Sequence, residues 1–280
     1  MKRILIPVDS SYNSSNAIDF AIKFFKREAC EFYFLNTYSY DVRGMDALSL
    51  LQSDDDWFEL PKLESQKILG FLVKKYTKDN KNEMHSYTAI SECADLVDGI
   101  QKSIEELKID FLLFSGKKKD ETSSDRYSRN TELIIKGIRE CPVIIVPENA
   151  HLKKNQEFVL ASSFEVGLPI KELKNWGKLL RLVKGKGRII AFNKSSDMTS
   201  VQKINLSQTL MRLYNISGSV LPIHYLNSEE EIKQFTQRHS DCIISIADKK
   251  PDIWRKLGIK NSEIVNLGPL HYTPLIALHS

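Results

Sequence analysis

The stretch formed by residues 109–147 constrains the fold of this chain more than any other. It begins with an unbroken apolar run ending in Ser115-Gly116, which is typical of a fully buried strand. After a polar loop, residues 130–135 have the polar start and apolar stripe of a helix, and the β-branched run Val143–Val146 predicts another strand. This order predicts a βαβ unit, whose loop opens at the carboxyl end of a parallel sheet, where open α/β folds bind ligands.

The residues before this unit extend the same alternation. Residues 3–9 predict a buried strand that delivers Asp9 at its carboxyl end, and a polar turn and a helix follow. Residues 38–61 are expected to be irregular, with the acidic run 54–56 exposed to solvent. The remaining elements are a helix over 17–25, strands over 31–37 and 85–90, and helices over 63–76 and 94–107. The order βαβαβαβαβ predicts a doubly wound parallel sheet.

The second half of the chain repeats this plan. Asp110 and Asp241 are 131 residues apart and Pro142 and Pro274 are 132 apart, which indicates duplication. The expected elements are strands over 158–163, 188–192, 219–225, 241–246 and 273–278, helices over 170–183, 198–214 and 229–238, and a short helix at Ile253, Trp254 and Leu257. The predicted fold is therefore two Rossmann-like α/β domains in tandem, residues 1–150 and 155–280.

Composition limits the classes of function. The 42% hydrophobic and 27% charged residues are typical of a globular protein, and no apolar run is long enough to span a membrane. The chain leads straight into a strand without a signal peptide, so we expect a cytoplasmic protein that does not bind membranes. Residues 1–150 carry 21 Lys and Arg against 25 Asp and Glu, whereas the rest has a net charge of +8. Such a basic half suits an acidic protein partner better than nucleic acid, because its charges are dispersed and not interleaved with stacking aromatics.

Neither the cysteines nor the histidines form a catalytic pattern. Cys30, Cys93, Cys141 and Cys242 occur singly, so we expect buried thiols and neither a disulfide framework nor a zinc site. The six histidines are scattered, and no nucleophile elbow, phosphate-binding lysine loop or zinc-protease motif is present. The sequence therefore predicts no catalytic residue and no metal ligand.

The loop of the βαβ unit resembles the nucleotide loop of the universal stress protein family. Binders in that family carry Gly-x-x-Gly, nine residues, Gly-Ser or Gly-Thr, a helix and a Pro-Val strand. Counting back from Pro142 places the three glycines at Gly116, Lys119 and Arg129, and counting forward from Asp110 places the first at Ser115. At most one of the three glycines is therefore kept.

The resemblance implies a site for ATP or AMP, with Mg²⁺, in the first half. In the family the strand ends in Pro-Val-Asp and its Asp accepts hydrogen bonds from adenosine; Asp9 occupies that position here, where it could equally cap the following helix. Asn130 or Thr131 is expected to cap the helix after the loop, whose free N–H groups would favour an anion. The implied nucleotide-binding residues are Pro7, Val8, Asp9, Thr37, Ser115, Gly116, Arg129, Asn130 and Thr131.

The loop itself leaves two interpretations. Glycine admits positive φ and lets backbone N–H groups approach phosphate, which Lys or Arg cannot do. The bases at residues 117–119, Arg126 and Arg129 would form a phosphate clamp or, because Asp120, Glu121 and Asp125 are interleaved with them, a solvated surface loop.

Two functions follow from the resemblance. The chain is either a stress-response adaptor that acts through its surfaces, with a degenerate nucleotide site, or an ATP- or AMP-binding sensor with at most slow ATP hydrolysis. The lost glycines favour the adaptor. Because single-domain family members pair through the strand after Pro-Val, residues 143–146 and 275–278 are expected to pair as an intramolecular pseudo-dimer, and a homodimer is also open.

Overall fold

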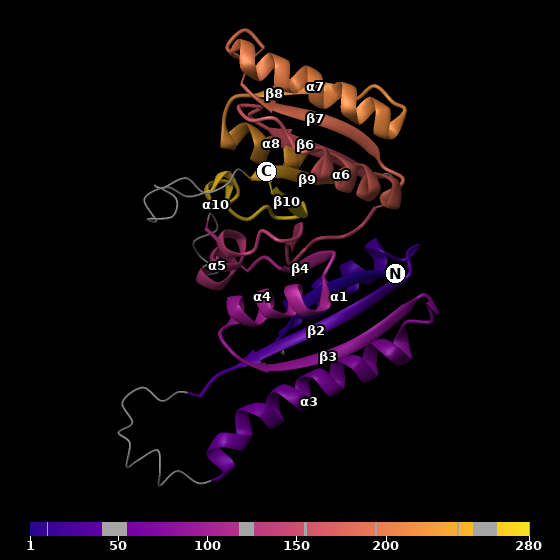
Figure 1. Cartoon of the computed structure of the whole chain (residues 1–280), viewed down its shortest axis with the longest axis vertical. Helices are drawn as coiled ribbons and strands as arrows, with labels where there is room; N and C mark the ends of the chain where they lie inside the picture. The colour runs from indigo at the N-terminus through magenta and orange to yellow at the C-terminus, as the bar shows by residue number, and fades with distance from the viewer. Residues whose placement is uncertain are drawn as a thin grey trace, which may run out of the picture.

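Ten strands form one sheet that runs through the whole molecule between two layers of helices (Figure 1). The computed structural model describes residues 1–9, 11–40, 55–117, 126–153, 156–193, 195–239, 241–248 and 262–279. In the first half the elements are β1 (Lys2–Pro7), α1 (Tyr12–Phe24), β2 (Cys30–Tyr38), α3 (Asp55–Asp79), β3 (His85–Cys93), α4 (Leu96–Leu107), β4 (Phe111–Ser115), α5 (Arg129–Gly137) and β5 (Val143–Val146).

The second half has the same alternation of strands and helices. Its elements are β6 (Glu157–Ser162), α6 (Ile170–Val183), β7 (Lys186–Phe192), α7 (Ser200–Ser217), β8 (Ile223–Leu226), α8 (Glu229–Arg238), β9 (Cys242–Asp248), α10 (Glu263–Leu267) and β10 (Leu275–His279). The strand order is β3-β2-β1-β4-β5-β10-β9-β6-β7-β8, so each half contributes five neighbouring strands in mirrored order. The predicted fold class is confirmed, and the repeated order is what duplication predicts.

The two halves meet at an antiparallel strand pair, whereas every other pairing in the sheet is parallel. Ile145 of β5 lies opposite Leu275 of β10, and Val143 lies opposite Ala277. Residues 143–146 and 275–278 are buried, with exposed fractions of 0–2%. The strand pairing expected from the sequence is therefore confirmed, and two edges that would otherwise expose unpaired N–H and C=O groups are covered.

The core continues across both halves on each face of the sheet. One apolar layer includes side chains of α1, α3, α6 and α7, and the other includes side chains of α4, α5, α8 and α10. Leu112 and Leu113 of β4 are fully buried, as predicted. Because successive residues of a strand point to opposite faces, Leu113 enters the first layer and Leu112 the second. A strand covered on both sides explains the unbroken apolar run.

Some sequence predictions were wrong at element ends. Helix α3 already begins at Asp55 and continues through Pro61, within the segment expected to be irregular; Leu69, Leu72 and Tyr76 anchor it in the core. Packing of this amphipathic face outweighs the local tendency of proline to end a helix. Residues 41–54 lie outside the described part of the chain.

Three further predictions, on the end of α7, on α10 and on the burial of Cys93, differ from the structure. Helix α7 extends to Ser217, where Gly218 takes the left-handed conformation, so β8 starts only at Ile223. Five-residue α10, capped by Ser262, was not predicted, because one turn gives no periodic pattern. Cys93 is exposed at the end of an edge strand, contrary to the expectation of buried thiols; the other three cysteines are buried. The helix expected at Ile253, Trp254 and Leu257 lies outside the described residues.

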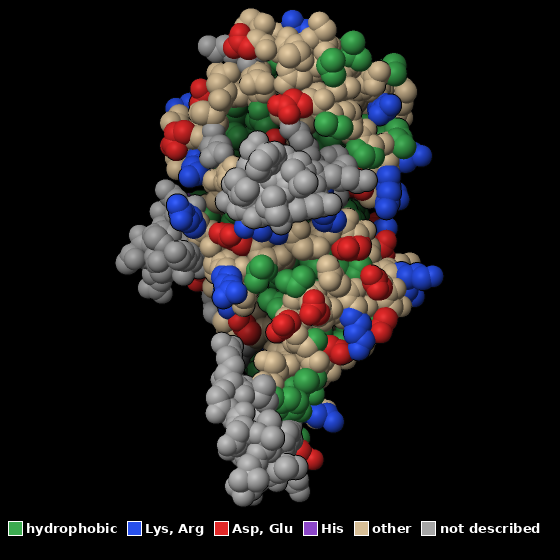
Figure 2. Space-filling model, turned by 60° about the vertical axis from the view of Figure 1, so that its left-hand side comes forward, with side chains coloured by type: hydrophobic (Ala, Val, Ile, Leu, Met, Phe, Trp, Pro, Cys, Tyr) green, Lys and Arg blue, Asp and Glu red, His purple; other side chains and the backbone are tan. Residues whose placement is uncertain are grey.

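Acidic side chains gather on one face of the first half, below the junction with the second (Figure 2). This agrees with the negative net charge counted over residues 1–150. None of the described helices combines the length and the apolar character needed to cross a membrane.

We predict that residues 1–150 alone self-associate or aggregate, because β5 then loses β10 as its neighbour and exposes an apolar edge. Sedimentation velocity of this fragment and of the full chain at equal concentrations measures the difference. A soluble, monodisperse monomer of the fragment would contradict the role assigned to the β5–β10 pair.

Candidate functional site

A pocket of about 520 Å³ opens at the carboxyl ends of β1, β2 and β4, beside the start of α5. Besides Ser14, Asn36, Leu96, Phe114, Lys117, Ser128 and Ile134, its lining contains eight of the nine residues singled out from the sequence: Pro7, Val8, Asp9, Thr37, Ser115, Arg129, Asn130 and Thr131. Gly116, the ninth, does not line it. Segments far apart in the chain thus converge where a doubly wound fold binds ligands.

The end of β1 is held by its neighbour β2. The N–H of Val8 donates to the carbonyl of Leu35 at 2.8 Å, and Asn36 Nδ2 donates to the carbonyl of Val8 at 2.8 Å. The N–H of Asp9 donates to Ser14 Oγ at 3.0 Å, which ties the residue to the first turn of α1. Ser11, and not Asp9, is the N-cap of α1.

The carboxylate of Asp9 accepts four hydrogen bonds. Its Oδ1 accepts from the N–H of Ser11 at 2.9 Å, from Ser11 Oγ at 2.5 Å and from Ser14 Oγ at 2.6 Å. Its Oδ2 accepts from Lys117 Nζ at 2.5 Å, in an ion pair that is partly exposed. Burial alone raises the pKa of Asp9, but the bonds from Lys117, Ser11 and Ser14 outweigh it and hold that pKa well below the usual range.

The sequence indicates Lys117 only as part of a phosphate clamp or a solvated surface loop, and it does not predict the hydrogen bond from Lys117 to Asp9. Two backbone hydrogen bonds hold Lys117 in place. The N–H of Lys117 donates to the carbonyl of Ser115 at 3.0 Å, and the carbonyl of Lys117 accepts from the N–H of Ser128 at 2.9 Å. Lys117 and Asp9 are 108 positions apart. No local pattern reports such a pair, although the parallel register of β1 and β4 places both strand ends at one edge. Lys118, Lys119, Asp120, Glu121 and Asp125 lie outside the described residues.

Gly116 serves packing in this structure. Its φ is not positive, contrary to the role expected for a loop glycine. A Cβ at this position would lie 2.5 Å from Ile145 Cγ2, well inside contact distance. Its N–H donates to the carbonyl of Val146 at 2.9 Å. The absence of a side chain therefore lets β4 and β5 continue side by side.

The helix at the pocket begins one residue earlier than expected. Ser128 is the N-cap of α5, and its Oγ accepts from the N–H of Thr131 at 3.4 Å, so Asn130 and Thr131 were wrong as caps. The error arose because three of the four residues in 128–131, all but Arg129, have capping side chains, and only the backbone geometry distinguishes them. Thr131 is buried, whereas Arg129 and Asn130 are exposed. The start of α5 thus presents free N–H groups and a cationic side chain to the pocket.

The pocket residues suit binding better than covalent chemistry. Asp9 is the one carboxylate among the described lining residues, and Lys117 already donates to its Oδ2. Mg²⁺ is usually held by one or two carboxylates together with substrate phosphates and waters, so Asp9, once released by Lys117, is the residue of the described lining that could contribute to holding it. Within the described part of the chain, no three His, Cys, Asp or Glu side chains gather as metal ligands do.

The corresponding end of the second half is built differently. Strand register places Ser162 where Asp9 stands in the first half. Phe164, two residues later, is fully buried and has a φ of 54°. Gln202 Nε2 donates to the carbonyl of Ser163 at 3.0 Å, and Asn205 Nδ2 to that of Phe164 at 2.9 Å. Side chains of α7 thus satisfy backbone groups at this strand end. Residues 249–261, after β9, lie outside the described residues.

Comparisons place the chain among known proteins. The model of the universal stress protein family matches residues 1–147. Among solved structures, a universal stress protein from Archaeoglobus fulgidus DSM 4304 superimposes with a TM-score of 0.66 at 13% identity, over 99% of this chain and 98% of that one. A putative universal stress protein from Pseudomonas aeruginosa UCBPP-PA14 gives 0.61 at 10% identity, over 99% and 93%.

A third structure, the cytoplasmic domain of a prokaryotic cation chloride cotransporter, gives a TM-score of 0.52 at 12% identity, over 99% of this chain and 94% of that one. At these identities the likeness concerns the fold alone. No curated protein matches the sequence.

Replacing Gly116 by Ala should destabilise the protein by about 1 to 3 kcal/mol, because the new methyl group overpacks Ile145. Gly70→Ala is the control: Gly70 lies within α3, and a Cβ there meets nothing within 4 Å. It should stabilise the helix by about 0.5 to 1 kcal/mol. Urea unfolding of both variants measures the two shifts, and an unaffected Gly116→Ala protein would contradict the packing role.

Proposed function

This chain belongs to the universal stress protein family, and we propose that it acts in the cytoplasm as a stress-response adaptor whose amino-terminal pocket works without adenine nucleotide. In this proposal two domains, residues 1–150 and 155–280, are fused into one body whose surfaces engage partner proteins. The acidic first half and basic second half offer two different surfaces for such contacts.

One observation carries the proposal: the carboxylate of Asp9 is already engaged by four hydrogen bonds from this chain, three on Oδ1 and that of the Lys117 ammonium on Oδ2. A carboxylate offers about four lone-pair positions, and Asp9 receives two bonds from Ser11, one from Ser14 and one from Lys117. An adenosine hydroxyl at Oδ2 would have to compete with the Lys117 ammonium, which already holds this oxygen by a charge-assisted hydrogen bond. The family interaction expected of Asp9 is therefore opposed by this chain's own lysine.

We predict that the purified full-length chain shows no saturable heat with AMP, which carries adenosine but a single phosphate, in titration calorimetry. Lys117→Met, which removes the ammonium but keeps an extended side chain, should free Oδ2 and raise the affinity. Lys136→Met is a matched control, because Lys136 is an exposed lysine of α5 whose partner is Glu132. Wild-type protein that binds one equivalent of AMP at micromolar concentration would overturn the proposal.

The pocket itself favours a second candidate function, an adenine-nucleotide sensor. Its volume of about 520 Å³ falls within the range of small-molecule sites, and the start of α5 suits an anion. In that case binding should titrate to one site per chain and be lost on Asp9→Ala. The same calorimetric experiment thus separates the two functions.

A further inference from the structure

A second pocket, with a volume of about 370 Å³, lies between the two halves at the amino ends of the strands. Asp9 lies at the opposite, carboxyl ends of the strands. At the amino ends, Lys2 begins β1, Arg27 precedes β2, and Lys184 precedes β7. The full lining is Lys2, Arg27, Glu28, Phe111, Lys178, Leu179, Arg181, Leu182 and Lys184. Five of these nine residues are basic and one is acidic.

A neighbouring hollow of about 300 Å³ shares Arg27 and Leu182 with this pocket. It is lined by Lys23, Phe24, Lys26, Arg27, Leu152, Lys153, Gln156 and Leu182, with no carboxylate. The two hollows, here called the junction pocket, bring together eight bases: Lys2, Lys23, Lys26, Arg27, Lys153, Lys178, Arg181 and Lys184. Four come from β1 and the end of α1, three from the end of α6, and one from the segment between the halves.

Helix ends account for only part of this charge. The carboxyl ends of α1 and α6 both lie here, and each carries the equivalent of about −0.5 charge, which favours nearby cations. Two ends therefore balance about one of the eight positive charges. Glu28 lines the pocket, and Asp110 lies 3.5 Å from Lys2 Nζ. Even without Lys153, a positive excess remains after these carboxylates are counted.

Four bases of the larger hollow are available to a ligand. Arg27, Lys178, Arg181 and Lys184 are all exposed. Within the described residues, none of these four has a carboxylate within the 4.0 Å of an ion pair. Like charges held together repel one another, and a bound anion relieves that repulsion.

We propose that the junction pocket binds a small molecule that carries several phosphate groups. Arg27 and Arg181 offer planar forks that hold phosphate oxygens in pairs, and the lysines add point charges around them. Phe111 and Leu179 form a buried apolar floor, and the pocket volume of about 370 Å³ is in the range of small-molecule binding sites. Phe24 and Phe111, the aromatic lining residues, are 4% and 5% exposed and cannot stack on bases, which disfavours single-stranded nucleic acid.

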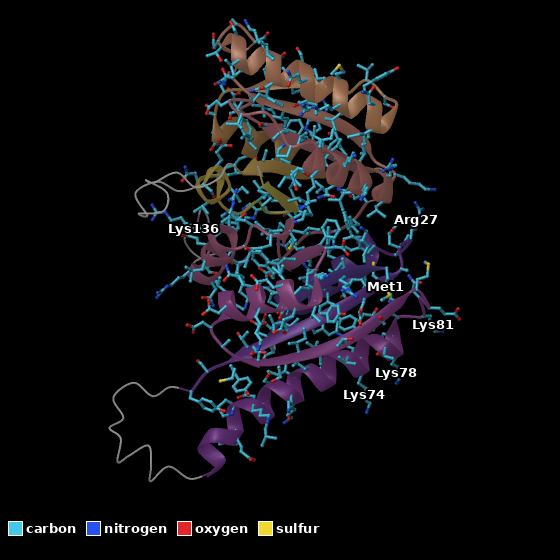
Figure 3. The ribbon with its side chains drawn as sticks, viewed as in Figure 1. Met1, Arg27, Lys74, Lys78, Lys81 and Lys136 are labelled. Atoms are coloured by element: carbon cyan, nitrogen blue, oxygen red, sulfur yellow. The ribbon has the colours of Figure 1, made fainter. Side chains whose placement is uncertain are left out.

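Inorganic tripolyphosphate is a suitable probe for the full-length protein, titrated by calorimetry at roughly 0.1 M salt, where exposed charges more than about 10 Å apart are largely screened. We expect one equivalent to bind the wild type, and the double variant Arg27→Gln/Arg181→Gln to weaken binding roughly tenfold or more. Lys74→Gln/Lys78→Gln is the matched control, because it removes two exposed positive charges from α3. Figure 3 shows Arg27 at the level of the junction and Lys78 and Lys74 farther down the same side of the molecule.

Further results decide the assignment. Arg129→Gln removes the exposed base at the start of α5 from the pocket at Asp9, and binding that survives this change supports the junction pocket. Equal weakening by both double variants, or no binding by the wild type, would overturn the proposal. A 20-nucleotide single strand or a vesicle with anionic lipid that binds more tightly than tripolyphosphate, with equal sensitivity to both double variants, would assign the bases to an extended surface and would also overturn it.

Discussion

The antiparallel pairing of β5 with β10 is the interaction on which the rest of this molecule depends. Each half alone would end in a fully apolar edge strand, and pairing satisfies both edges within a single chain. The pair makes one sheet out of two repeats, and the helical layers on each face become continuous across it. The same alignment brings the end of α6 beside the end of α1 and thereby creates the junction pocket. A site of that kind cannot exist on either half alone.

The two ends of the strands carry the polar sites of this molecule, whereas the middle of the sheet carries its apolar core. At the carboxyl ends, the first half keeps a pocket of nucleotide size but uses Lys117 to neutralise the acid at its base. In the second half, Gln202 and Asn205 of α7 satisfy the strand-end carbonyls instead. At the amino ends, exposed bases from both repeats face one hollow. Duplication thus leaves each repeat free to change its strand ends while the shared core stays apolar.

Much of the fold could be predicted because strands buried on both faces and amphipathic helices have distinct periodicities. Helices Ile170–Val183 and Glu229–Arg238 were predicted to the residue, and the alternation of strands and helices in the second half followed from the repeat. The approximate place of the site also followed, because the carboxyl ends of parallel strands meet at one edge. Its internal geometry did not: the bond from Lys117 to Asp9, the cap at Ser128 and the contact that requires Gly116 depend on atoms brought together by tertiary packing.

Hydrogen exchange of the backbone amides in residues 143–146 and 275–278 tests the central role of the β5–β10 pair most directly. If the pair holds the halves together, these amides should exchange as slowly as those of β1 and β6, through global unfolding of the chain. If the halves were independent, alternate amides along both strands would face solvent and exchange orders of magnitude faster than those of β1 and β6. That second result would contradict the account of one continuous sheet.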